Sequence, residues 1–319
     1  MDRGTGDEGG AGVSGNTARM GFVGVDTANS SIQRVFPLWA RELALPTDEL
    51  VGHDLPLDAP DSAYRELVEG MRADPAYRGA LITTHKIRVW EAAADLFAEL
   101  DDFARLCGEI SSVSKRGDLL AGHAKDPLTA GLAMVDFLPR GHFARTGAEV
   151  VCLGAGGAGT AITWWLAHHD DPPPRIVSVD SDPARIERLR GVHARGGLPP
   201  GMFGYEVAGP GTDAATLVRQ APPGSLVINA TGMGKDRPGS PLPAGTPFPE
   251  QALVWEINYR GPLEFLAQAR AQREERGLTV EDGWSYFIHG WSQAIATIFD
   301  LSLTPDLVHK LAKLAEVVR

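Results

Sequence analysis

The sequence contains little cysteine and no strongly basic segment. Only two cysteines, Cys107 and Cys152, occur among 319 residues, and they lack CxxC spacing. Neither a disulfide framework nor a zinc site is therefore predicted, and no metal is expected. The formal net charge is −11, without a stripe of Lys and Arg. This disfavours nucleic acid as a partner, because binding to a phosphate backbone relies on clustered cations.

Long apolar runs are also missing. No uninterrupted apolar segment reaches the roughly 20 residues that a membrane span requires. The start of the chain lacks the apolar region of a secretory signal. We therefore expect a cytoplasmic protein with no membrane partner. Residues 1–20 are rich in glycine, and we expect them to form a disordered head.

Two domains are expected from the length. In the first half of the chain, strand-like and helix-like segments alternate, which predicts a mostly parallel sheet wrapped by helices. A hairpin is expected over 110–126, turning at Arg116-Gly117-Asp118, and a linking helix follows over 127–138. The alternating segments are strands at 20–25, 50–57 and 77–83, and helices at 32–45, 62–74 and 87–108.

The second half repeats the alternating pattern from Glu149 onward. Its strand-like segments have helical stretches between several of them, so a second α/β unit is expected. The end of the chain is helical, and Thr304-Pro305-Asp306 suits a cap followed by Pro at the first helical position. The strand-like segments are 149–156, 175–182, 205–210, 226–232 and 253–259.

A glycine cluster follows the first of these strands and opens a helix, in the sequence "VVCLGAGGAGTAI". A dinucleotide diphosphate needs this arrangement, because glycines permit a tight turn, close approach of the backbone to phosphate and close packing of helix on strand. The helix N-terminus adds free N–H groups and a positive dipole. The candidate cofactor-binding residues here are Gly154, Gly156, Gly157, Ala158 and Gly159.

Asp180 ends the next strand, where a carboxylate can accept hydrogen bonds from the adenosine ribose. A 2′-phosphate would be repelled there, Asp182 adds a second negative charge, and the first arginine, Arg185, comes five residues after Asp180. NAD is therefore expected, with NADP as the alternative. Either acidic residue is also suited to capping the helix that follows.

Three further segments, "ITTHK", "AGHAKD" and "INATGMG", together with the glycine loop, resemble the shikimate and quinate dehydrogenase family. The resemblance runs in the same order from about residue 21 to the end. It implies that Lys86 is the catalytic lysine and Asp126 its partner. A proton donor near a carbonyl oxygen is what hydride reduction of a ketone requires. The alternatives are a solvated lysine at a strand end and a helix N-cap ahead of Pro127.

The segments that bind substrate in the family are altered in this chain. The family's S-x-S hydroxyls fall in "ANSSIQ", where Ser30 and Ser31 are present but Ile32 takes one of the expected hydroxyl positions. The family's A-V-N-T asparagine corresponds to Ser114. Where the family has G-x-N-T-D, Ala124 and Lys125 occur instead. Lys125 and the nearby His123 either contact an acidic substrate group or face solvent.

Other substrate-side positions also depart from the family pattern. A tyrosine is replaced by Ile257, and "LITT" places Thr83 and Thr84 near the site. Gln293 resembles the family's substrate-contacting glutamine, with an interhelical glutamine as the alternative. Since several hydrogen-bonding groups have changed together, we expect retained hydride chemistry on an altered substrate.

The resemblance also assigns cofactor contacts to Asn229, Ala230, Thr231 and Gly232, which close a strand beneath the nicotinamide ribose. We expect a substrate domain over 21–126, a Rossmann-type doubly wound domain over 127–282, and terminal helices over 283–319 that return to the first domain.

The expected activity is NAD(P)-dependent, reversible reduction of the ring ketone of a shikimate- or quinate-like carbocycle. A homodimer is the candidate assembly. The alternatives are a reductase of a different ketone or imine, and a catalytically silent dinucleotide-binding protein.

Overall fold

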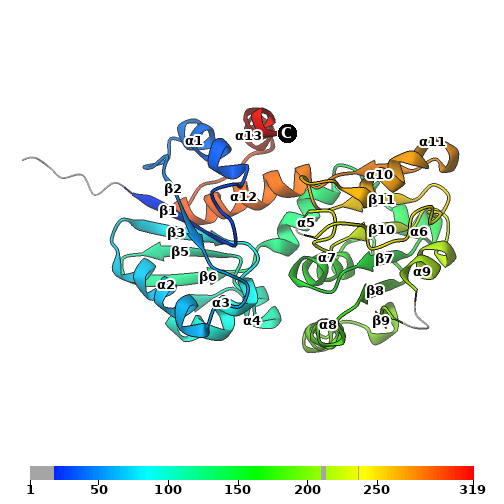
Figure 1. The fold of residues 1–319 in the computed structure, drawn as a ribbon, viewed down its shortest axis with the longest axis horizontal. Coiled ribbons are helices and arrows are strands. Elements are labelled where there is room, and N and C mark those ends of the chain that lie inside the picture. The colour runs from blue at the N-terminus through cyan, green and yellow to red at the C-terminus, as the bar shows by residue number, and fades with distance from the viewer. Residues whose placement is uncertain (1–17, 210–212, 236) are drawn as a thin grey trace, which may run out of the picture.

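Two α/β units follow one another along the chain in the computed structural model (Figure 1). The structure describes residues 18–209, 213–235 and 237–319. Most of the predicted glycine-rich head, residues 1–17, lies outside the described residues. The first strand begins at Arg19, within the segment expected to be disordered. Within the described part of the chain, no helix is long and apolar enough to cross a bilayer.

The first unit is built on a mixed six-stranded sheet in the order β2-β1-β3-β5-β6-β4. β1 pairs in parallel with β2 and β3, and β4 with β6, whereas β5 is antiparallel to β3 and β6. The hairpin predicted at Arg116-Gly117-Asp118 joins β5 to β6. The strands are β1 (Arg19–Gly24), β2 (Leu50–Asp54), β3 (Tyr77–Ile82), β4 (Glu99–Leu100), β5 (Ser112–Arg116) and β6 (Leu119–His123).

The prediction of one long helix over 87–108 is wrong. The segment is broken after Ala93, and Phe97 is extended and buried. The Asp101 carboxylate accepts a hydrogen bond from the Ala104 N–H and starts a new helix. Residues that alternated at helical spacing therefore divide between two helices and an edge strand. The helices of this unit are α1 (Ile32–Glu42), α2 (Asp61–Ala73), α3 (Lys86–Ala93), η1 (Ala94–Leu96) and α4 (Asp102–Cys107).

The second unit contains a parallel six-stranded sheet in the order β12-β11-β10-β7-β8-β9. Read from the β9 edge, with β7 counted as strand 1, this is the order 3-2-1-4-5-6 of doubly wound dinucleotide-binding sheets. The predicted fold class is therefore confirmed. The short β12 was not predicted. The strands are β7 (Val150–Leu153), β8 (Ile176–Asp180), β9 (Phe203–Val207), β10 (Leu226–Asn229), β11 (Leu253–Glu256) and β12 (Thr279–Glu281).

Helices cover both faces of this second sheet, because successive strand residues alternate between two cores. Val150 packs with α5 and α7, and the next residue, Val151, packs with Val218 of α9 and Phe265 of α10. The helices are α5 (Asp126–Met134), α6 (His142–Thr146), α7 (Gly157–Ala167), α8 (Pro183–Arg195), η2 (Pro200–Met202), α9 (Ala214–Gln220), α10 (Glu264–Ala271) and α11 (Arg273–Arg276).

The last helices pack in the core of the first unit, where α13 lies beside α1 (Figure 1). These are α12 (Trp284–Phe299), α13 (Pro305–Ala315) and η3 (Glu316–Val318). Trp39 donates a hydrogen bond to the Leu311 carbonyl at 2.8 Å, and Phe22 meets Trp291 edge to face. Thr304 caps α13 as predicted. The chain thus leaves the first unit at α5 and returns to it at α12, so both segments border the junction.

Candidate active site

A cavity of about 350 Å³ is lined by residues of both units. The first unit contributes the segment after β3 and the segment before β5, and the second contributes the start of α7. The starts of α3 and α5, one face of α12, Lys235 and the segment after β11 also line it. The lining residues include Thr83, Thr84, Lys86, Glu109, Ser111, Ser112, Lys125, Asp126, Gly157, Ala158, Ile257, Tyr259, Tyr286, Gly290, Trp291 and Ala294.

Lys86 and Asp126 form an ion pair in this cavity. Lys86 is the first residue of α3 and Asp126 the first of α5. The Lys86 ammonium donates to both carboxylate oxygens of Asp126, at 2.8 and 2.7 Å. The two side chains are only 20 % and 15 % exposed. Burial disfavours the lysine charge, but the carboxylates of Asp126 and Glu109 outweigh it and raise the pKa of Lys86. Lys86 therefore presents a charged ammonium to the cavity, and Asp126 holds that ammonium in place.

Tyr286 of α12 is a further member of this polar group. Its hydroxyl lies 3.4 Å from Asp126 Oδ1 and donates toward it. Burial and the Asp126 charge raise the pKa of Tyr286 well above its ordinary value, so the hydroxyl keeps its proton. The sequence analysis did not identify Tyr286, because its position on an apolar helix is typical of core residues.

Two buried polar side chains that line the cavity have an oxygen without a partner among the described residues. These atoms are Glu109 Oε2 and Ser112 Oγ. Glu109 is 3 % exposed, and burial raises its pKa to about 7. The sequence analysis missed both residues. The available signal was Glu109 as the one charged residue of segment 106–114, where an unpaired charge is costly to bury.

Of the substrate-side residues suggested by the sequence, Thr83 and Thr84 line the cavity. The Thr83 hydroxyl donates to the Val23 carbonyl, at the adjacent strand. Ser30 and Ser31 are not among the lining residues, but they neighbour Tyr259, which is. Burial raises the pKa of Tyr259, and its neighbours Arg260, Ser31 and Ser30 act against that rise. These two serines therefore border the site through a tyrosine.

The structure does not bring Ser114 and Gln293 to this cavity. Both line a second cavity of about 420 Å³, in which Ser114 Oγ lies 2.9 Å from His123 Nε2. Ser112, rather than Ser114, pairs with Leu81 near the carboxyl end of β3, because β5 runs antiparallel to β3.

The face of α12 explains the position of Gln293. Its residues 286, 287, 290, 291 and 294 line the first cavity, whereas residues 293, 296, 297 and 300 line the second. The two sets occupy different stripes of one helix. Gly290 therefore lies where a side chain would enter the first cavity, and a Cβ added there would meet only Thr129 Cγ2, at 3.7 Å.

Three glycines of the loop after β7 differ in the space around them. Gly154 has a φ of +112°, and a Cβ on it would lie 2.7 Å from the Ala230 backbone. A Cβ on Gly159 would lie 2.0 Å from the Gly154 carbonyl oxygen, so helix and strand pack without a side chain between them. A Cβ on Gly156 would meet nothing within 4 Å. Open space therefore lies over the helix start, which suits a diphosphate.

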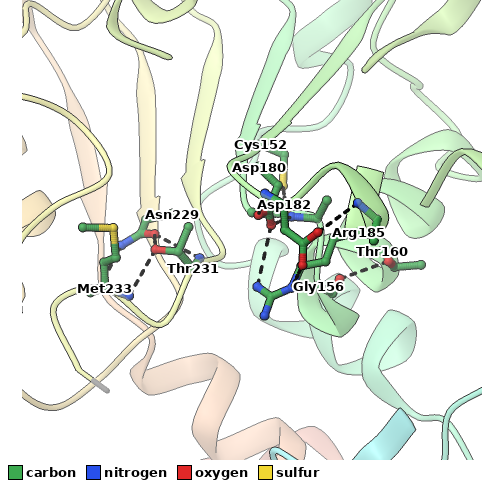
Figure 2. Close-up of polar contacts among 12 residues, drawn as sticks. Cys152, Gly156, Thr160, Asp180, Asp182, Arg185, Asn229, Thr231 and Met233 are labelled. Carbon is green, nitrogen blue, oxygen red and sulfur yellow. Dashed lines mark hydrogen bonds and ion pairs between the residues drawn. The ribbon is translucent and has the colours of Figure 1, made fainter. Parts of the chain in front are cut away.

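Asp180 joins the glycine loop to the turn after β8, with one carboxylate oxygen bonded to each (Figure 2). It accepts hydrogen bonds from the N–H groups of Ala155, at 2.8 Å, and Asp182, at 3.0 Å. The cap of α8 is Asp182 and not Asp180. Arg185 turns back to lie 3.9 Å from Asp180 and 3.6 Å from Asp182. A cation therefore lies beside both carboxylates.

The Asn229–Gly232 segment lies across from the glycine loop (Figure 2). Its polar side chains bond to one another, to the Met233 backbone and to Glu256 of β11. Asn229 donates to Glu256 and accepts from the Thr231 N–H and hydroxyl, and the Thr231 hydroxyl accepts from the Met233 N–H. Burial raises the pKa of Glu256 to about 7. Asn229 thus shapes the loop, whereas the Ala230 backbone meets Gly154 directly.

Comparisons with known proteins agree with this architecture. No family model matches the chain. A shikimate dehydrogenase (NADP(+)) from Methylobacterium radiotolerans is 30% identical over 277 residues, covering 86% of this chain and 88% of that protein. A second shikimate dehydrogenase (NADP(+)), from Streptococcus gordonii, is 30% identical over 215 residues, covering 66% and 70%.

Among solved structures, a quinate dehydrogenase from Corynebacterium glutamicum in complex with NAD superimposes with a TM-score of 0.73. It is 20% identical and covers 94% of this chain and 99% of that chain. The likeness shows a shared fold. Sequence relatives, fold and motif order agree, and the chain belongs to the shikimate and quinate dehydrogenase family.

Proposed function

We propose that this chain is an NAD(P)-dependent oxidoreductase that reversibly reduces the ring ketone of a shikimate- or quinate-like carbocycle. The observation that carries the proposal is the Lys86–Asp126 pair in a cavity whose wall includes the start of the glycine-loop helix. A bound nicotinamide supplies or accepts the hydride in such a cleft. The protein residues hold the ring and move the proton.

In the reducing direction Lys86 acts as the proton donor to the carbonyl oxygen. Its raised pKa keeps it protonated, and the paired oxygens of Asp126 fix its position. Asp126 also stabilises the ammonium when the proton returns during alcohol oxidation. The Tyr286 hydroxyl, which keeps its proton, also donates to the Asp126 carboxylate.

The charges around the cavity favour an anionic substrate. Lys125 lines it, with its ammonium 3.5 Å from Asp101. A carboxylate on the carbocycle would approach this cation. The proposal is tested by following NADH and NADPH oxidation with dehydroshikimate, dehydroquinate, their amino analogues and other cyclic ketones. Turnover confined to non-carbocyclic ketones or imines would replace the proposed substrate class, and no turnover with the whole panel would contradict the activity.

The steric constraints of the glycine loop give a matched pair of variants. We expect Gly156→Ala to change the free energy of unfolding by less than about 0.5 kcal/mol, since the added methyl group meets nothing. The same methyl group enters the space proposed for the diphosphate, so the Kd for NADH should rise at least about tenfold, or 1.4 kcal/mol. Tryptophan fluorescence titration measures this.

Gly159→Ala is the comparison variant. Its methyl group would overlap the Gly154 carbonyl oxygen, and we expect a loss of about 1–3 kcal/mol of unfolding free energy in urea denaturation. If Gly156→Ala instead leaves the Kd for NADH unchanged, the diphosphate does not lie over this helix start.

We further propose that NAD binds more tightly than NADP. Asp180 and Asp182 present two carboxylates at the end of β8, and Arg185 is already engaged by both. A 2′-phosphate would compete for that arginine and approach like charges, which costs about 1 kcal/mol at a partly exposed site. We expect a preference for NAD of about fivefold, measured by parallel titrations.

Asp182→Asn should narrow this preference, whereas Glu187→Gln, a carboxylate one turn further along the exposed face of α8, should not. Tighter binding of NADP by the wild-type protein would show that Arg185 serves the 2′-phosphate. The cytoplasmic location and the homodimer stay predictions from the sequence.

A further inference from the structure

Glu109 lies where the two units meet. It precedes β5 in the first unit, yet its carboxylate rests against Gly157, the first residue of α7 in the second unit. A Cβ on Gly157 would fall 2.5 Å from Glu109 Oε2 and 3.3 Å from Oε1. Arg188 of α8 fixes the preceding backbone, donating to the carbonyls of Cys107 and Gly108 at 2.7 and 2.8 Å. The position of Glu109 is therefore held from both units.

The carboxylate faces the helix start, and its Oε2 has no hydrogen-bond partner among the described residues. An ionised carboxylate accepts hydrogen bonds only, and leaving one of its oxygens buried and unpaired is unfavourable. In the protonated form one oxygen becomes a donor, which suits a neighbour that is itself an anion. The arrangement thus favours a neutral Glu109 whenever a second anion occupies the helix start.

The groups around Glu109 come from five helices, α3, α4, α5, α8 and α12. Lys86 favours its charge, Asp126 opposes it, and Arg188 favours it weakly, while the buried Cys107 thiol and the Tyr286 hydroxyl keep their protons. Burial is the largest influence and raises the pKa of Glu109 to about 7. Small changes in its surroundings therefore change its protonation near neutral pH.

We propose that Glu109 couples dinucleotide binding to the uptake of one proton, because the diphosphate and an ionised Glu109 cannot both lie against the first turn of α7. This inference rests on the proposed function, since it takes a dinucleotide as the ligand. Glu109 binds the proton as the diphosphate enters and then donates a hydrogen bond toward it. In the absence of ligand above pH 7, the carboxylate is ionised and opposes entry.

The affinity of the protein for NADH should depend on pH. Binding favours protonated Glu109, so affinity is highest below pH 7 and falls as pH rises above it. For a group that titrates near 7, the Kd should increase about tenfold between pH 6 and 8. NADH is a suitable probe because it lacks the phosphate monoester whose second pKa lies near 6.

The experiment is titration of the full chain with NADH across this pH range, for the wild type, Glu109→Gln and Glu99→Gln. Glu99 is an exposed carboxylate of β4 that lines the second cavity, so its variant is the matched control. We expect Glu109→Gln to bind with a Kd that varies less than about twofold and equals the wild-type value at pH 6. Glu99→Gln should follow the wild type.

Calorimetry of the wild-type protein in two buffers of different ionisation enthalpy is an independent test that needs no variant. At pH 8 it should detect uptake of about one proton for each NADH bound. A pH-independent wild-type Kd, an unchanged pH dependence in Glu109→Gln, or no proton uptake would overturn the role of Glu109 while leaving the dinucleotide site intact. No NADH binding at any pH would overturn this role and the proposed function together.

Discussion

Replacement of Lys86 by alanine is expected to lower kcat for ketone reduction by about 10²–10⁴-fold, the usual contribution of a positioned acid. The ammonium is held by both oxygens of Asp126 and faces the cavity. The Kd for NADH should stay within about threefold of wild type, since Lys86 lies outside the glycine loop. Stopped-flow reduction and fluorescence titration give the two quantities.

Lys125→Ala is the matched control for this variant. Lys125 lines the same cavity but lies near Asp101 rather than Asp126. We expect a higher KM for an anionic substrate and a kcat within about fivefold of wild type, because an interaction made equally in the ground and transition states affects binding alone. If Lys86→Ala keeps its kcat, Lys86 is not the proton donor.

Asp126→Asn is expected to lower both turnover and stability. The amide keeps the shape of the side chain but leaves a largely buried ammonium without its counterion, which costs about 3 kcal/mol of unfolding free energy. Loss of the carboxylate also lowers the pKa of Lys86, because the Asp126 charge is one of the causes that raise it. The pH above which the reduction rate falls should therefore move downward. Rate profiles between pH 6 and 10 measure that shift.

The double variant Lys86→Met, Asp126→Asn is the control for stability. With both charges removed, the loss should be smaller than for Asp126→Asn alone, since no unpaired ion is left. An unchanged pH profile in Asp126→Asn, with wild-type stability, would show that the two side chains are not coupled in the working enzyme.

Local sequence signals were sufficient for most of the fold. Alternating apolar strands and amphipathic helices predicted two α/β units, and the Gly154–Gly159 loop located the dinucleotide-type unit. The failure at 87–108 has a physical cause, because the Asp101 side chain caps a new helix and Phe97 is drawn into the core. The helical spacing of apolar residues cannot reveal either effect.

Site residues could be predicted from the sequence only where a side chain of suitable chemistry also lay in a recognisable motif. Lys86 and Asp126 lie 40 residues apart in sequence, and the resemblance paired them before the structure showed their contact. Ser114 and Gln293 line the second cavity rather than the first because of strand register and helix phase, neither of which the sequence motifs encode. Glu109 was missed because its partner surface, Gly157, belongs to the other unit.

The most direct test of the account is isotope transfer from NADH deuterated on the nicotinamide ring. With a dehydroshikimate- or dehydroquinate-like ketone, the wild-type protein should yield an alcohol that carries one deuterium on the former carbonyl carbon. Lys86→Ala should bind the same NADH and yield almost none in the same time. Product without deuterium, or no product from any cyclic ketone despite bound NADH, would contradict hydride transfer in this cleft.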